Sequence, residues 1–371
     1  MKIKKWIWEH PGWPNFEYYL NDTIHQRLYS YAKTFNGYPG LDNMPKEEYT
    51  DLIIDIMVAE ATKSSQIEGE NINPMEVRSS LMKQLGINEQ TKIKPSLKAN
   101  GIAQLMYMVR KDFSEPLSEN MILKWHEQIM LGASPYTIFN SGIFRAKEDD
   151  MQIVSGPIGS EKIHYLAPPS TKINKEMARF IHWFNDKENI QLPGPIRAAI
   201  GHLYFECLHP FEDGNGRIGR AIVEKILSQE QNMPIMFSVS TVLHERRKEY
   251  YNELSKASGY SINITDWIGW FIEVIIDSVE KSREITDFTV RKAKFWKKYS
   301  DKLNSRQIVV LKRMFKEGPK GFDGGISAKK YIAMVEISKA TATRDLAQLL
   351  ELGCIYKLRS AGRSTRYNLK F

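Results

Sequence analysis

The segment from His209 to Arg220 brings together a base, a carboxylate, a glycine-framed turn and two arginines. It reads His-Pro-Phe-Glu-Asp-Gly-Asn-Gly-Arg-Ile-Gly-Arg. Arg217 and Arg220 are three positions apart, so on a helix they share a face and could hold two phosphates in succession. This set of residues indicates a site for a magnesium-bound polyphosphate beside a hydroxyl group that must lose its proton.

Each part of the segment has a physical reason to serve such a site. Gly214 and Gly216 remove side chains where backbone N–H groups approach phosphate oxygens, and they allow positive φ angles. Asp213 offers a hard oxygen ligand of the kind that Mg²⁺ prefers when it also binds phosphate. His209 is the only histidine of the segment and can act as a base near neutral pH. Transfer of a phosphorus-centred group needs little beyond positioning, charge neutralisation and such a base.

None of these parts is specific alone. Gly-Asn-Gly is a common turn, and a histidine next to a proline is usually structural. The ordered set of twelve residues is far more specific than any of its members.

Two buried helices are predicted to hold the segment. Apolar residues recur at helical spacing from Ile196 to Cys207, after a break at Pro193-Gly194-Pro195. A second apolar stripe runs from Ile222 to Leu227, and residues 217–220 form the first turn of that helix. The segment is therefore a loop between helices, and the amides that open the second helix favour an anion.

An earlier helix, predicted over residues 49–69, carries a second candidate group. Its apolar positions follow the helical period: Tyr49, Leu52, Ile53, Ile56 and Met57. Ser64 and Glu68 lie one turn apart on this face, just before Gly69. A carboxylate at a helix C-terminus opposes the macrodipole, so Glu68 is misplaced unless a cation holds it. From these residues alone, a solvated glutamate is the simpler interpretation.

Composition and length indicate a globular protein of two or three domains. The chain has 371 residues, of which 42% are hydrophobic and 26% are charged. No apolar run approaches the roughly 18 residues that a membrane span needs. The two cysteines, Cys207 and Cys354, are too few for a disulfide framework and predict a reducing, cytoplasmic location.

The positive charge lies in the last fifth of the chain. Residues 301–371 hold 15 Lys and Arg against 6 Asp and Glu, whereas the whole chain has a net charge of +8. Helices are predicted over 308–315 and 328–335, and Ser338 can cap a third helix that Gly353 ends. Two strands follow, over 354–359 and 365–371, around Ser360-Ala361-Gly362. This order resembles a winged helix-turn-helix, which would bind DNA through its third helix or serve as a protein-contact or dimerisation unit.

The remaining segments complete a mainly α prediction. Trp6, Trp8 and Trp13 predict an anchor that packs against a larger body. His126, in a helix predicted over 117–131, is expected to be a packed or surface residue rather than a ligand. Short β-prone runs between Asp149 and Tyr165 surround a Gly/Pro turn and predict a hairpin. Further helices are predicted over 174–184, 266–279 and, as a charged connector, 281–302.

The segment at residues 209–220 resembles the signature of Fic-domain proteins, His-x-Phe-x-Asp/Glu-Gly-Asn-Gly-Arg-x-x-Arg, and fills every specified position. Residues 64–69, Ser-Ser-Gln-Ile-Glu-Gly, match the family's inhibitory pattern Ser/Thr-x-x-x-Glu-Gly/Asn. The resemblance covers about residues 49–279 and includes the hairpin, which resembles the family's target-docking flap. It implies four parts: an N-terminal anchor segment (1–48), a Fic catalytic domain (49–279) with its inhibitory helix (49–69), a helical connector (280–303) and a winged helix-turn-helix (304–371).

The resemblance implies transfer of AMP from ATP, with Mg²⁺, to a Ser, Thr or Tyr hydroxyl of a protein target or of the chain itself. It makes His209 the general base and Asp213 the Mg²⁺ ligand. The phosphates would contact Gly214, Asn215, Gly216, Arg217 and Arg220. Phe211 would anchor the loop in the core.

Other roles that the resemblance implies lie outside the loop. Glu68 would pair with Arg220 and obstruct the γ-phosphate, with Ser64 steadying the turn. Tyr250 and Tyr251 would lie near the nucleoside, and the flap would consist of Ile153, Val154, Ser155 and Gly156. Where relatives place an Asn near the adenosine this chain has Ser258, so that contact is not carried over. Removal of AMP, with Glu68 orienting a water, stays open, as do a DNA-binding regulator that senses nucleotide and a homodimer.

Overall fold

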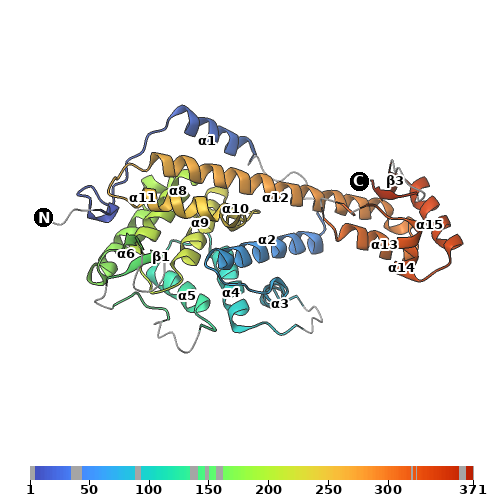
Figure 1. Ribbon diagram of the computed structural model, residues 1–371, viewed down its shortest axis with the longest axis horizontal. Coiled ribbons are helices and arrows are strands. Elements are labelled where there is room, and N and C mark those ends of the chain that lie inside the picture. The colour runs from blue at the N-terminus through green and yellow to red at the C-terminus, as the bar shows by residue number, and fades with distance from the viewer. Residues whose placement is uncertain are drawn as a thin grey trace. The chain divides into compact units, whose positions relative to one another are not determined.

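Helix α8 (Gly194–Leu208) is buried along its whole length and leads directly into the loop at residues 209–214. Helix α9 (Asn215–Gln231) follows the loop and packs against α8. The computed structural model describes residues 5–34, 44–87, 93–133, 141–146, 150–155, 162–318, 321–322, 324–358 and 365–370. The chain is mainly helical, as the sequence predicts (Figure 1).

The described residues divide into two compact units. Residues 5–34 and 53–280 form the first unit, and residues 44–52 and 281–370 form the second. The other helices of the first unit are α1 (Asp22–Thr34), α3 (Pro74–Gln84), α4 (Leu97–Lys111), α5 (Glu119–Ile129), α6 (Ser170–Asn185), α7 (Lys187–Ile190), α10 (Val239–Glu245) and α11 (Arg247–Ala257). The chain enters and leaves this unit through α2 (Lys46–Ile67) and α12 (Thr265–Tyr299). The predicted four-part domain division stays a prediction.

One helix replaces two predicted ones. The core helix expected over 266–279 and the connector expected over 281–302 are a single helix, α12. No glycine or proline lies between Trp270 and Gly318, so the sequence contains no helix breaker at the junction expected near residue 280. Its later apolar residues are also buried, since Phe288, Phe295 and Tyr299 belong to the core of the second unit.

The N-terminal tryptophans fasten an irregular segment to the first unit. The segment begins with a short 3₁₀ helix, η1 (Ile7–Glu9). Trp8 donates its indole N–H to the Leu166 carbonyl at 2.7 Å, and Trp13 donates its own to Glu176 at 2.9 Å. Trp6 forms an isolated β-bridge with Gly259. The segment therefore joins the hairpin, α6 and the turn after α11.

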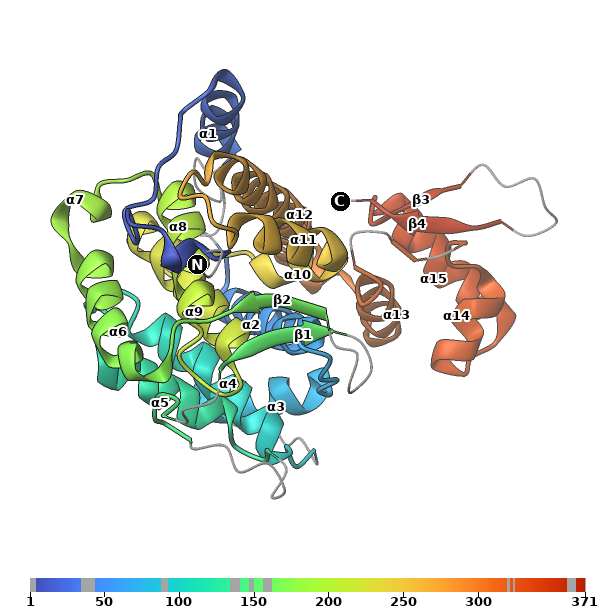
Figure 2. The ribbon, with the colours of Figure 1, turned by 60° about the vertical axis from the view of Figure 1, so that its left-hand side comes forward.

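The predicted hairpin consists of β1 (Gln152–Ser155) and β2 (Lys162–Leu166), the two green arrows of Figure 2. The strands are antiparallel, with Ile153 opposite Tyr165 and a register shift after Ile153. Tyr165 is buried and donates its O–H to the Cys207 carbonyl at 2.7 Å. The hairpin is thereby attached to the end of α8, next to the loop.

The second unit contains η2 (Ser300–Lys302), α13 (Ser305–Phe315), α14 (Ala328–Val335), α15 (Lys339–Glu351), β3 (Ile355–Lys357) and β4 (Tyr367–Leu369). Ser338 caps α15 as predicted, by accepting the Thr341 N–H. Asp345 is buried on α15 and accepts hydrogen bonds from Arg306 on α13 and from Tyr331 on α14. The Asp345 carboxylate thus ties the three helices together. The predicted turn at residues 360–362 lies outside the described residues.

Among the residues described, no helix combines the length and the apolar character that crossing a membrane requires. The predicted cytoplasmic location stays a prediction.

Candidate active site

The loop between α8 and α9 has left-handed backbone at both ends. His209 ends α8 with φ 47° and ψ 57°, and Gly214 precedes α9 with φ 84°. A non-glycine residue in this region is strained, so the surrounding structure must hold His209 in place. Asn215 provides part of that hold, because its amide accepts the Phe211 N–H at 2.9 Å and donates to the Phe211 carbonyl at 2.8 Å. The Asn215 side chain thus faces the loop backbone, and only the backbone N–H of Asn215 is left to face an anion.

His126 on α5 packs against the loop and stabilises it. Its ring stacks on the buried Phe211 ring, with centroids 3.9 Å apart. Its Nδ1 accepts the Gly142 N–H at 2.9 Å, so its Nε2 carries the proton that is donated to the Asp213 carbonyl at 3.2 Å. Burial lowers the pKa of His126 to about 4, which keeps the ring neutral. His126 is a packed residue, as the sequence predicts.

Arg145 holds the first half of the loop. Its guanidinium donates to the carbonyls of His209 at 2.7 Å and Pro168 at 2.5 Å, and its own N–H donates to the Pro210 carbonyl at 2.9 Å. Burial lowers the pKa of Arg145 to about 10. The bonds to successive loop carbonyls fix the direction in which the His209 side chain leaves the backbone.

His209 faces a cavity of about 680 Å³. The cavity lies between the hairpin, the end of α8, the start of α9 and the helix α11. Its lining includes His209, Gly216, Glu68, Glu206, Tyr250 and Tyr251. Burial, and after it the charge of Arg145, lowers the pKa of His209 to about 4. The imidazole is therefore neutral at physiological pH and can accept a proton from a group in the cavity.

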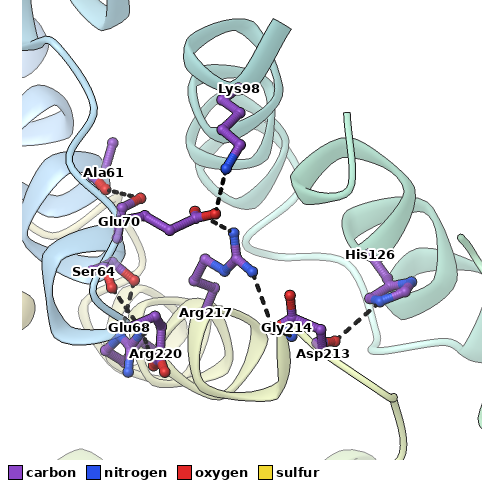
Figure 3. Close-up of polar contacts among 11 residues, drawn as sticks. Ala61, Ser64, Glu68, Glu70, Lys98, His126, Asp213, Gly214, Arg217 and Arg220 are labelled. Carbon is purple, nitrogen blue, oxygen red and sulfur yellow. Dashed lines mark hydrogen bonds and ion pairs between the residues drawn. The ribbon is translucent and has the colours of Figure 1, made fainter. Parts of the chain in front are cut away.

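Residues at the end of α2 and just after it hold Arg220 through its Nε and Nη2 atoms (Figure 3). Its Nε donates to the Ser64 hydroxyl and its Nη2 to the Ser64 carbonyl, both at 2.9 Å. Nη2 also donates to Glu68 at 2.7 Å. Burial by itself lowers the pKa of Arg220, but Glu68 outweighs it and the net pKa is raised. Ser64 thus acts on the arginine directly, whereas the sequence predicted that it would steady the turn.

A second carboxylate, which the sequence analysis missed, occupies Arg217. Glu70 lies two residues after Glu68 and accepts from Arg217 at 2.9 Å and from Lys98 on α4 at 2.7 Å. Figure 3 shows Glu70 between these two cations. Gly69 has φ 84° and turns the chain so that two carboxylates separated by one residue reach different arginines. Both Arg217 and Arg220 on α9 are therefore paired with carboxylates of the segment that follows α2.

Family comparisons agree with the signature in the loop. Residues 116–227 match the model of the Fic/DOC family, and residues 6–87 match that of a domain of unknown function, DUF4172. The chain contains a Fic domain. The chain is 33% identical over 142 residues to protein adenylyltransferase fic-1 of Caenorhabditis briggsae, and 31% identical over 154 residues to its Caenorhabditis elegans namesake.

These matches cover 38% and 41% of the chain, but only 24% and 26% of the two relatives. The fold is similar to that of a Fic family protein from Desulfovibrio desulfuricans, with a TM-score of 0.57 at 19% identity over 95% of this chain and 97% of that one. It is also similar to a Fic-domain protein from Bacteroides thetaiotaomicron, with a TM-score of 0.53 at 18% identity over 74% and 97% of the two chains.

Asp213 at the Fic loop suits a magnesium ion that the substrate also binds. Its side chain is 47% exposed, and Oδ1 accepts the Gly214 N–H at 2.6 Å and lies 3.4 Å from Arg217. The described residues contain no cluster of three or more potential metal ligands. A single carboxylate fits Mg²⁺ bound with phosphates, because this ion keeps waters and takes only one or two protein oxygens.

The predicted nucleoside residues and flap residues of the Fic domain lie around the same cavity. Tyr250 is buried, and its hydroxyl oxygen forms a hydrogen bond of 2.9 Å with Nε2 of His202. Tyr251 is partly exposed, and its hydroxyl group donates to the Ile67 carbonyl. Ile153 and Val154 on β1 line the cavity, and Ser155 is the last residue of that strand. Gly156 lies outside the described residues.

Proposed function

We propose that the chain is a self-inhibited enzyme that transfers AMP from ATP to a hydroxyl group of a protein, either a separate target or the chain itself. The observation that carries the proposal is the position of His209 at the cavity, beside the N-terminus of α9 and its two arginines. The activity for which these relatives are named, protein adenylyltransferase, supports the same reaction.

The nucleoside of ATP would occupy the cavity between the hairpin and the tyrosines of α11. Its phosphates would extend to the first turn of α9, where Gly216 has no side chain to keep a phosphate from the backbone N–H groups and the helix dipole favours an anion. Arg217 and Arg220, three positions apart on α9, would bind successive phosphates. Mg²⁺ held by Asp213 would neutralise part of the phosphate charge.

His209 would then accept the proton of the target hydroxyl. The hydroxyl oxygen forms a bond to the α-phosphorus of ATP, the bond from that phosphorus to the oxygen bridging to the β-phosphate breaks, and pyrophosphate leaves with the electron pair. A neutral imidazole is required for this step, and the lowered pKa of His209 provides it. A target segment pairing with β1 as an additional strand would bring its hydroxyl to His209.

Glu68 would keep this reaction slow in the resting protein. Its carboxylate is 2.7 Å from Arg220, where the γ-phosphate would have to bind. A carboxylate in that place repels the phosphate and occupies its arginine, so ATP would bind in a pose unsuited to in-line attack. The Glu70–Arg217 pair adds a second carboxylate against the phosphates.

The position of the label in ATP tests the reaction type. Incubating the Glu68→Gly variant with Mg²⁺ and ATP labelled at the α- or the γ-phosphate is expected to label protein only from the α-position, because AMP carries only that phosphorus. Gel autoradiography or intact-protein mass spectrometry reads the result, with His209→Ala as the matched control. Label arriving from the γ-position would mean phosphate transfer and would contradict the proposal.

A second candidate function is DNA binding by the C-terminal unit, with the nucleotide site as a sensor. The exposed face of α15 presents Lys339, Thr343, Arg344 and Gln348, and the exposed residues of β3 and β4 include Lys357. Fluorescence anisotropy with duplex DNA should show an affinity that falls steeply with salt, and Arg344→Ala should weaken it. A DNA affinity that changes neither with salt concentration nor with Arg344→Ala would contradict this function and favour a protein-contact role.

A further inference from the structure

Glu206 is a buried carboxyl group that the proposed mechanism does not use. It lies on α8, three residues before His209, in a helix that is otherwise mostly apolar, and it is 6% exposed. It lines the cavity, and its Oε1 has no hydrogen-bond partner among the described residues. A buried donor or acceptor that is left without a partner is unfavourable. An unpaired carboxyl at a ligand cavity indicates that the ligand supplies the missing partner.

Gly219 on α9 makes room for this carboxyl group. A Cβ atom at position 219 would stand 2.7 Å from Glu206 Oε1 and 3.1 Å from His202 Nδ1. The glycine of the signature segment thus lets the acid pack against α9 at the position next to Arg220 in the sequence, and the charges of Arg220 and Glu68 both act on it. Glu206 is therefore placed beside the arginine that the terminal phosphate would use.

The groups that face Glu206 set its charge. Burial, followed by the nearby Glu68 carboxylate, raises the pKa of Glu206 to about 8, against the opposing effect of Arg220. The neighbouring His202 is neutral, because burial lowers its pKa to about 3, and burial raises the pKa of Tyr250 well above its usual value. At neutral pH Glu206 is thus mostly a carboxylic acid, which carries an O–H donor.

We propose that Glu206 contacts the nucleotide: as a neutral acid it donates a hydrogen bond to the terminal phosphate of ATP once that phosphate replaces Glu68 beside Arg220. This inference rests on the proposed function. An ionised Glu206 would repel the phosphate and compete for Arg220, whereas the protonated acid adds a donor to an anion in a buried site. Glu206 would in this way favour ATP over ADP, which lacks the third phosphate.

The proposal predicts that ATP binding takes up a proton. In the Glu68→Gly variant the carboxylate that raises the pKa of Glu206 is gone, so the pKa falls in the free protein. The phosphate then raises it again on binding, because its charge disfavours the ionised acid. A group whose pKa is higher in the complex binds protons on complex formation, so the affinity for ATP falls as pH rises, by at most about tenfold per pH unit for one group.

Isothermal titration calorimetry in buffers of different ionisation enthalpy measures this uptake. Glu68→Gly is compared with Glu68→Gly/Glu206→Gln at saturating Mg²⁺, with ATP and ADP as ligands. Glutamine keeps the size of the side chain and offers an N–H donor in place of the O–H of the neutral acid, but it cannot titrate. We expect the single variant to take up more protons with ATP than the double variant does, and the double variant to have the flatter pH dependence. The difference in proton uptake between the two variants removes the contribution of protons bound by ATP itself. With ADP as the ligand, the two variants should take up equal numbers of protons.

Equal proton uptake and equal pH dependence in the two variants would overturn the role of Glu206 while leaving nucleotide binding intact. Failure of Glu68→Gly to bind either nucleotide would overturn the proposed function as well. Gly219→Ala, in which the added methyl group displaces the Glu206 carboxyl, is the second variant if Glu206→Gln does not fold. In the Glu68→Gly background, Gly219→Ala should weaken the binding of ATP more than the binding of ADP. An equal loss of affinity for both nucleotides would count against the proposal.

Discussion

Replacing Glu68 with glycine is expected to raise the rate of AMP transfer by at least tenfold over the unaltered chain. The change removes the only carboxylate that the described structure pairs with Arg220 and leaves the arginine to a phosphate. If the blocked pose is favoured by about 1.4–3 kcal/mol, releasing it corresponds to a roughly 10- to 150-fold change. Initial rates of label transfer from α-labelled ATP, to the chain itself or to a host-cell extract, measure the effect.

Glu70→Gln is the matched control for this prediction. Glu68 and Glu70 have side chains of equal exposure, 28%, and each pairs with one arginine of α9. If occupancy of Arg220 is the obstruction, Glu70→Gln should change the rate much less than Glu68→Gly does. Equal increases would mean that total negative charge at the phosphates is what inhibits. An unchanged rate in a folded Glu68→Gly variant would contradict inhibition.

The direction of the reaction is tested with the same variants. If Glu68 serves to orient a water that removes AMP, a pre-labelled target should lose its label with the unaltered chain and keep it with Glu68→Gly. That result, without any gain in transfer, would favour removal over transfer as the main reaction.

The sequence predicted the parts of the site that are local in the chain. The apolar stripes before and after residues 209–220 located α8 and α9, and the 49–57 stripe located α2, because helical burial leaves a 3.6-residue period in a single helix. The loop residues were found together because the signature is contiguous. The family resemblance, rather than any spacing, connected Glu68 with Arg220, which are 152 residues apart.

The supporting contacts could not be predicted in this way. Glu70 reaches Lys98 and Arg217, and Arg145 reaches His209, across long stretches of sequence that carry no pattern linking the partners. Glu206 left a readable signal, because a glutamate within a buried helix needs a reason to be there. The sequence also did not predict that the two expected helices form the single helix α12. The apolar face of its first half belongs to one core, and that of its second half belongs to another.

Replacing His209 with alanine, in the Glu68→Gly background, is expected to lower the rate of AMP transfer by about 10²–10⁴-fold. The loss should fall on kcat, with little change in the affinity for ATP, because the imidazole is proposed to act on the target hydroxyl rather than on the nucleotide. Calorimetry with ATP provides the second readout. Loss of nucleotide binding together with activity would instead mean that the strained residue holds the loop, and would remove the basis for calling it a base.

The pH dependence tests the same residue without changing it. An ordinary histidine is half protonated near pH 6.5, whereas burial lowers the pKa of His209 to about 4. The competent form is the neutral one, which is lost only as pH falls through the folded-state pKa. At saturating ATP and Mg²⁺, the rate of Glu68→Gly should therefore stay nearly constant between about pH 7 and 5.5, rather than fall about tenfold. His126 and His202 are also buried and neutral, so protonating them in stronger acid opposes folding, and tryptophan fluorescence must confirm the native state at each pH. A rate that halves near pH 6.5 in the folded variant would show that the acting base is a solvated group, and would exclude His209 from that role.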